Sequence, residues 1–118
     1  GAAYITSPTL NPYCMSKAMV DRVWHSWQSE VHDIAFGHCS PGAVDTDMFS
    51  LLKTDACANA ERNRTIPLVP PELSAKFLSW LLMKTPWDDF RGTSWQFYDK
   101  VHHKHWAGNA DIKNPFDD

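Results

Sequence analysis

The sequence predicts an α/β fold with a parallel sheet, because a helical pattern followed closely by a strand pattern occurs twice. Residues 11–30 have the pattern of a long amphipathic helix, and the short, mostly apolar stretch 33–39 follows directly. Residues 70–85 have a second helical pattern, after which residues 91–98 place Trp95 and Phe97 between polar neighbours. A helix joined to a strand by a few residues is half of a right-handed crossover unit, which connects parallel strands. The fold class is therefore α/β.

The first helix follows a stretch that cannot itself continue a helix or a strand. Residues 1–5 are small and apolar and indicate the end of a strand, and residues 6–12 form a loop. Asn11 and Pro12 then begin the helix, with Asn11 as its cap and Pro12 at the first helical position. The apolar stripe of residues 15–27 is wider than a surface helix needs. We expect this helix to be covered on two sides, by a sheet and by a helix of a second subunit, or to be buried within one larger domain.

The strand at 33–39 ends in a Pro-Gly turn, where open α/β sheets bind their ligands. Residues 49–69, which we call the lid segment, are polar and irregular, with a short helix expected near 56–62. A loop of this length is usually a lid or a mobile binding segment. The alternative is a solvated surface loop without function. Residues 101–118 are expected to be a polar, irregular tail, and its histidines are too loosely placed to predict a metal site.

The composition fits one modest globular domain and excludes several classes of function. The chain has 118 residues, 43% of them hydrophobic, with a net charge of −3. This charge provides no basic surface for nucleic acid. The longest apolar run, 77–83, is too short to cross a membrane, so a soluble cytoplasmic protein is expected. Three cysteines without a C-x-x-C pattern indicate free thiols, and six tryptophans indicate large apolar surfaces in a core or a subunit interface.

The most informative pair is Tyr13 and Lys17 in the first turns of the long helix. Residues four apart lie one above the other on the same face of a helix. A lysine ammonium close to a phenol stabilises the phenolate and lowers the tyrosine pKa from its usual value of about 10. The spacing therefore predicts a proton-transfer pair, although chance alone also supplies this spacing often.

Tyr-x-x-x-Lys at a helix start, then a strand, then Pro-Gly-x-Val-x-Thr-x-Met resembles the C-terminal half of a short-chain dehydrogenase/reductase. The resemblance covers residues 1–100, and the Val-Asp-Thr-Asp-Met wording is similar to the sepiapterin-reductase-like branch. It implies the C-terminal portion of a doubly wound, Rossmann-type parallel sheet. It also implies hydride transfer between NAD or NADP and a small carbonyl or alcohol substrate, in a homo-oligomeric parent protein without nucleic-acid or membrane partners.

The resemblance also assigns roles to individual residues. Tyr13 would be the catalytic acid/base, and Lys17 would lower the tyrosine pKa and hydrogen-bond the nicotinamide ribose. The residues implied to bind the cofactor are Tyr13, Lys17, Pro41, Gly42, Val44 and Thr46.

Two parts of that family's site are missing from the sequence. Counting back from Tyr13, the family's catalytic serine falls just ahead of Gly1, and Ser7 is too close to Tyr13 to replace it. The five glycines are not grouped, so no glycine-rich dinucleotide loop is present. We therefore expect a fragment of an oxidoreductase that is inactive alone. The alternatives are a non-catalytic relative that acts as a dimerisation or interaction module, and an unrelated small α/β binding domain.

Overall fold

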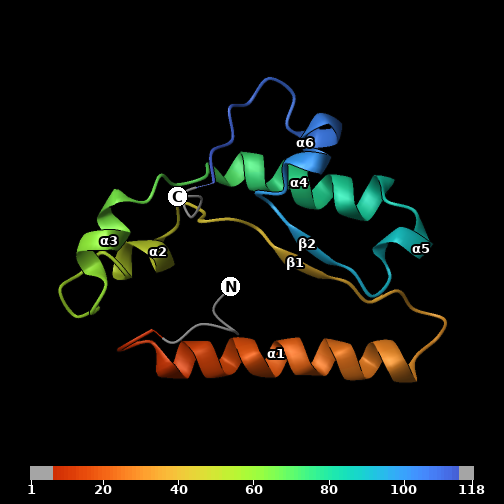
Figure 1. The fold of residues 1–118 in the computed structure, drawn as a ribbon, viewed down its shortest axis with the longest axis horizontal. Coiled ribbons are helices and arrows are strands. Elements are labelled where there is room, and N and C mark those ends of the chain that lie inside the picture. Colours follow the sequence, from red (N-terminus) through yellow and green to blue (C-terminus); the bar gives the residue numbers. More distant parts are fainter. Residues whose placement is uncertain (1–6, 115–118) are drawn as a thin grey trace.

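The computed structural model describes residues 7–114, so the strand end expected at residues 1–5 lies outside the described part of the chain. The fold is mixed α/β and mostly helical, as predicted at the level of class. A parallel sheet of β1 (His38–Ser40) and β2 (Ser94–Gln96) lies between the long helix α1 (Asn11–Glu30) and a pair of helices on its other side, α4 (Pro71–Lys84) and α6 (Lys100–Trp106) (Figure 1). Shorter helices are α2 (Asp47–Leu51), α3 (Ala60–Thr65) and α5 (Trp87–Phe90).

The two strands are shorter than the sequence pattern indicates. Their register pairs His38 with Ser94, Cys39 with Trp95 and Ser40 with Gln96. Backbone hydrogen bonds continue just outside these pairs, from Gly92 to Phe36 and from the residue after β2 to Ser40. Among the described residues β1 and β2 pair only with each other. Regular strand structure therefore ends where these two segments separate.

Helix α1 has the predicted bounds but a different cap. Leu10 occupies the N-cap position without a side-chain hydrogen bond, and Asn11 is already helical. The prediction that Asn11 caps the helix is therefore wrong. The first turn is closed instead by the backbone hydrogen bond from Cys14 to Leu10, at 2.9 Å, while Pro12 stands where no backbone donor is needed.

The main core lies between β2, α4 and α6. Phe77 of α4 and Phe97 just after β2 are fully buried and meet edge to face, with 5.8 Å between their ring centroids. Trp106 of α6 lies 5.0 Å from each of these two rings, and Leu81 and Trp95 belong to the same cluster, with Val69 and Ala107. Contacts of this kind each add stabilisation beyond simple area burial.

The structure corrects the expectation of an irregular tail after residue 100. Residues 100–106 form α6, whose first backbone donors include the amide of Val101, bonded to the Asp99 carboxylate. His103 bonds the backbone oxygen of Phe97 through Nε2 at 2.9 Å. Trp106 packs against the apolar side of α4 in the core. The free energy gained by burying this side chain outweighs the polarity of the lysine and histidine residues around it.

The lid segment is more helical than expected. The short helix predicted near 56–62 is found at Ala60–Thr65, and α2 precedes it directly after the Pro-Gly turn. The chain returns to the sheet through a parallel bridge between Val44 and Val69, with the Val69 amide 2.8 Å from the Ala43 oxygen. The lid segment is therefore closed at its base by backbone hydrogen bonds.

Helix α1 is only half covered by the described chain. Trp24 is buried and stacks on His38 of β1, with 6.0 Å between the ring centroids. The large apolar residues on its other faces are exposed: Met15, Met19, Val20, Val23 and Trp27. Of the two covers predicted for this helix, the described residues supply the sheet.

None of the helices within residues 7–114 combines the length and the apolar character that a membrane span requires.

Candidate functional site

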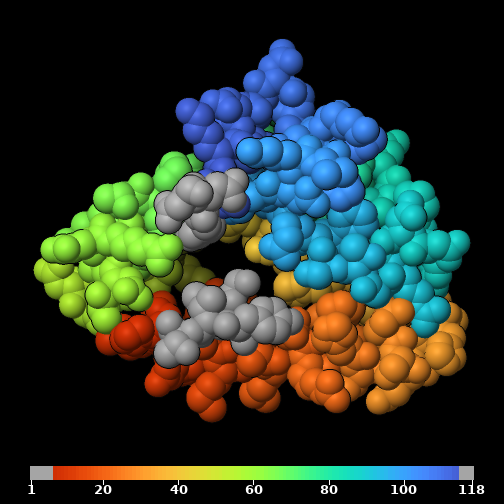
Figure 2. Space-filling model, in the orientation of Figure 1, coloured from red at the N-terminus to blue at the C-terminus, as the bar shows by residue number. Residues whose placement is uncertain are grey.

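A pocket of about 620 Å³ opens between the first turns of α1 and the segment that runs from Pro41 to Cys57. In the space-filling view the green lid segment lies against the red end of α1, and an opening is visible at the centre of the molecule, beside the lid segment and above α1 (Figure 2). The pocket walls include all of the residues that the sequence assigned to a site: Tyr13, Lys17, Pro41, Gly42, Val44 and Thr46. Two segments separated by more than twenty residues of sequence thus meet at one cavity.

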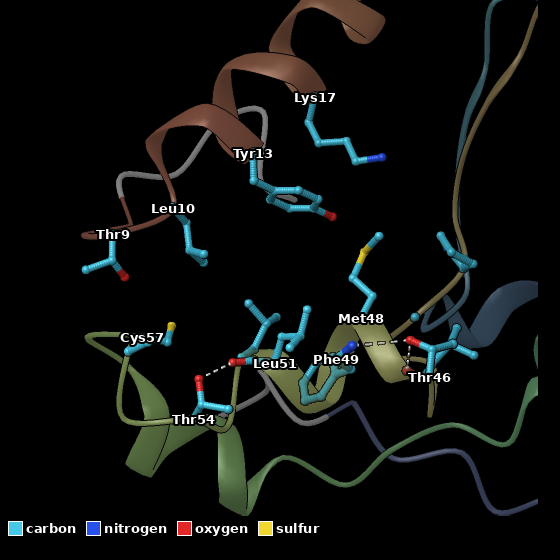
Figure 3. A pocket seen from close by; sticks show the side chains of 15 residues that line it. Thr9, Leu10, Tyr13, Lys17, Thr46, Met48, Phe49, Leu51, Thr54 and Cys57 are labelled. Atoms are coloured by element: carbon cyan, nitrogen blue, oxygen red, sulfur yellow. Dashed lines mark hydrogen bonds between the residues drawn. The ribbon is translucent and has the colours of Figure 1, made fainter.

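Tyr13 and Lys17 form one wall, and the face that they share is set by the rest of α1. Positions 13, 17, 24 and 28 fall on the same side of a helix. Trp24 is buried against β1, and the Gln28 side-chain oxygen accepts a hydrogen bond from the Phe36 amide at 3.3 Å. These contacts turn Tyr13 and Lys17 toward the pocket, where the Lys17 ammonium lies 5.4 Å from the centre of the tyrosine ring (Figure 3).

The C-terminal end of α1 is held by an arginine from the segment before β2. Arg91 Nη2 donates to the backbone oxygens of Gln28 and Val31 at 3.2 and 3.3 Å, and it contacts His32 Nδ1 at 3.2 Å. A cation at this end of a helix also complements the helix dipole. The orientation of the helix, and with it the tyrosine face, is therefore fixed at the end farthest from the pocket.

The Pro-Gly turn is shaped by packing against the core. Gly42 has φ +89°, in the region that favours glycine, and a Cβ there would lie 3.0 Å from Phe97 Cδ1 and 3.2 Å from Val69 Cγ2. The Tyr98 hydroxyl accepts a hydrogen bond from the next amide, that of Ala43, at 3.0 Å. Burial raises the pKa of Tyr98, and this hydrogen bond offsets part of that rise. A further bond from Ser74 Oγ to the carbonyl before Gly42 ties the turn to α4.

The wall that faces Tyr13 comes from α2 and the residues after it. Thr46 caps α2, since its Oγ1 accepts from the Phe49 amide at 3.3 Å while contacting the Val44 oxygen at 3.4 Å. Beyond this cap the wall is apolar, and in Figure 3 Met48 reaches toward the tyrosine hydroxyl. Sequence reasoning did not assign Met48, Phe49 or Leu51 to the site. The available signal was an apolar group directly after the Pro-Gly motif, at the start of an otherwise polar segment.

The lid segment is tied to the residues just before α1. The Ala58 amide donates to Thr9 Oγ1 at 3.1 Å, and Asn59 Nδ2 donates to Ser7 Oγ at 3.2 Å. Thr9 has φ 68°, a backbone conformation that is costly for a β-branched residue and persists only where its surroundings hold it. These bonds close the pocket at the end opposite the sheet.

Lys17 is the one charged residue among the described residues that line the pocket. Outside this lining, burial raises the pKa of Cys39 in β1 to about 11, which keeps that thiol protonated near neutral pH. Within residues 7–114, no group of three or more His, Cys, Asp and Glu side chains is placed to hold a metal ion. The Tyr13 hydroxyl, the Lys17 ammonium and the apolar side chains of the pocket suit hydrogen-bonding, proton-transfer and apolar contacts.

Comparison of the chain with models of protein families, with curated proteins and with solved structures found no match.

Proposed function

We propose that this chain carries the proton-transfer part of an NAD(P)-dependent oxidoreductase site of the short-chain dehydrogenase/reductase type. The observation that supports this most directly is the single pocket that joins the Tyr13–Lys17 pair to the turn and cap of residues 41–46. These are the parts that the resemblance assigns to acid/base chemistry and to the nicotinamide. On the same proposal, the two parallel strands are the C-terminal portion of a doubly wound sheet.

In the proposed reaction Tyr13 gives its hydroxyl proton to a substrate carbonyl oxygen as that oxygen becomes an alcohol. The Lys17 ammonium, on the same face of α1, stabilises the phenolate that remains, and a proton from solvent restores the hydroxyl. Reduced NAD or NADP, when bound, supplies the hydride that adds to the carbonyl carbon. Oxidation of an alcohol follows the same path in reverse, with Tyr13 accepting the proton.

The lining residues fit one end of such a cofactor. An ammonium at Lys17 suits the hydroxyls of the nicotinamide ribose, and the Pro41–Gly42 turn with Val44 gives the ring a mostly apolar neighbour. Within the described part of the chain the pocket lining has no second cation for a pyrophosphate, and the sequence has no grouped glycines. We therefore propose that the chain binds a nicotinamide mononucleotide weakly and does not turn over NADH or NADPH on its own.

The test is a titration of the chain, labelled with ¹³C in its tyrosine rings, with reduced nicotinamide mononucleotide. The ring signal of Tyr13, assigned with Tyr13→Phe, should shift saturably at roughly millimolar ligand, and by more than the signal of the partly buried Tyr98. Lys17→Gln should weaken this binding, and Lys76→Gln, which alters an exposed lysine on α4, should leave it unchanged.

Four results would contradict parts of the proposal. Equal ligand affinity of the Lys17→Gln and Lys76→Gln variants would contradict the nicotinamide site. A Tyr13 ring signal that does not shift would contradict it as well. Robust NADH or NADPH oxidation by this chain would contradict the incomplete site, and oxidation that survives Tyr13→Phe would contradict the role of the tyrosine.

A second candidate function is a dimerisation module without catalysis. The observation that favours it is the exposed row Met15, Met19 and Val23 on α1, with Trp27 exposed beside it. Apolar surface concentrated on one helix face is typical of an interaction site. Light scattering should then give a monodisperse dimer without cofactor, and Met19→Lys should make it monomeric while Met83→Lys on α4 does not. A monomer, or nonspecific aggregates, would contradict this function.

A further inference from the structure

The two walls of the pocket differ sharply in chemistry. The α1 wall carries Tyr13 and Lys17, and the opposite wall carries Met48, Phe49 and Leu51 (Figure 3). Among the described residues 7–114, no carboxylate side chain lines the pocket. A substrate that lies between these walls therefore meets polar groups on one side and hydrocarbon on the other.

The threonines that line the pocket do not change this picture, because each hydroxyl already has a backbone partner. Thr9 Oγ1 accepts from the Ala58 amide, Thr46 Oγ1 accepts from the Phe49 amide, and Thr54 Oγ1 donates to the Leu51 oxygen at 2.7 Å. These hydroxyls shape the loops around the pocket. They leave few polar contacts for a ligand on the lid side.

The Tyr13 hydroxyl and the Lys17 ammonium differ from these threonine hydroxyls in their hydrogen bonding. Neither group forms a hydrogen bond with another residue in the described range 7–114, and both extend from α1 into the pocket in Figure 3. A single ligand oxygen beside Tyr13 would use this capacity. A charged group against the apolar wall would lose part of its hydration without gaining a counter-ion on that side of the pocket, which is costly.

We propose that the substrate is an uncharged ketone or aldehyde with an apolar body, its oxygen at Tyr13 and its hydrocarbon against Met48, Phe49 and Leu51. This inference rests on the proposed function for the identity of the reaction. In the reduction the carbonyl carbon gains a hydride from the reduced nicotinamide dinucleotide, the C=O π pair takes the proton of Tyr13, and the product is a neutral alcohol. The apolar wall sets specificity, and Tyr13 sets the position of the reacting oxygen.

The experiment measures binding to the full chain without cofactor by NMR of the ligand, a signal that Tyr13→Phe also gives, and the ¹³C signal of the Tyr13 ring places the ligand in the unsubstituted chain. Methyl hexyl ketone should bind more tightly than methyl butyl ketone, by about two- to fourfold for each added methylene. The ketone that carries a terminal carboxylate should bind at least tenfold more weakly than methyl hexyl ketone. The alkene in which a methylene group replaces the carbonyl oxygen should also bind more weakly, and Tyr13→Phe should remove that difference.

A matched pair of variants tests the wall itself. Leu51 is 68% exposed and lines the pocket, and Leu82 on α4 is 73% exposed and lies outside it. Leu51→Gln should weaken binding of methyl hexyl ketone by roughly fivefold, and Leu82→Gln should not change it. Circular dichroism should show both variants folded, since neither side chain is buried.

The possible failures separate the two proposals. Preferential binding of the carboxylate-bearing ketone, or equal effects of the two leucine variants, would overturn the apolar substrate class and leave Tyr13 as the acid/base. Equal binding of ketone and alkene, unaffected by Tyr13→Phe, would overturn the carbonyl chemistry of the proposed function and this inference with it.

Discussion

Replacing Gly42 with alanine should destabilise the protein through two separable effects. The backbone at Gly42 has φ +89°, which costs an L-residue about 1–2 kcal/mol. The new methyl group would also stand 3.0–3.2 Å from Phe97 and Val69, two buried core residues. Overpacking of this kind typically costs about 1–3 kcal/mol. The sum is about 2–5 kcal/mol, a large part of the stability of a small domain.

Gly108 provides the control for the backbone effect alone. It has φ +62°, and a Cβ there would meet nothing within 4 Å. Gly108→Ala should therefore cost about 1 kcal/mol, because the strain is partly offset by the lower entropy of the unfolded chain. Urea unfolding followed by tryptophan fluorescence gives both free energies. If Gly42→Ala is no less stable than Gly108→Ala, then the turn is not packed against the core as described.

The remaining predictions concern the anchor of α1 and the buried thiol. Arg91→Ala should lower the free energy of unfolding by about 1–3 kcal/mol and speed hydrogen exchange at the C-terminal end of α1. Arg22→Ala, at an exposed position of α1 itself, should lower it by less than about 0.5 kcal/mol. Equal losses in the two variants would refute the role of Arg91 as an anchor. The Cys39 pKa is raised from 9.0 to about 11, so the unfolded chain loses the thiol proton first and stability should fall between these pH values. The loss should be about 1–2 kcal/mol after allowing for partial exposure, and it should diminish in Cys39→Ser when unfolding is measured across this range; an unchanged slope would refute it.

The long helix and the parallel order of the strands could be predicted because both depend on local pattern. The bounds of α1 follow from Pro12 and from an apolar stripe that continues to Trp27. Helix α6 could not be predicted in this way. Its sequence is dominated by histidine and lysine. The segment folds as a helix because Trp106 packs against Phe77 of α4 and Phe97 after β2. Tertiary burial there outweighs local polarity.

The residues of the candidate site also fall into two groups, those that the sequence could identify and those that it could not. Tyr13, Lys17 and the Pro-Gly turn carry motif spacing, so they could be named from the sequence. Met48 closes the Pro-Gly-x-Val-x-Thr-x-Met motif but received no role from it, and Leu51 lies outside the motif. Both enter the pocket because Thr46 caps a short helix that turns them toward α1. The bonds of Thr9 and Ser7 to the lid segment depend on a backbone conformation at Thr9 that no propensity predicts.

The pocket and the core lie on different sides of the sheet, and this separation decides which substitutions are informative. Phe77, Phe97 and Trp106 stabilise the α4 side, whereas Tyr13 and Leu51 lie on the α1 side and contribute little buried surface. Regions with little buried apolar surface open locally at low free energy without unfolding the domain. Variants of Tyr13 or Leu51 should therefore change binding at nearly constant stability. Gly42 is different, because it lines the pocket and packs on Phe97, so its substitution changes both quantities together.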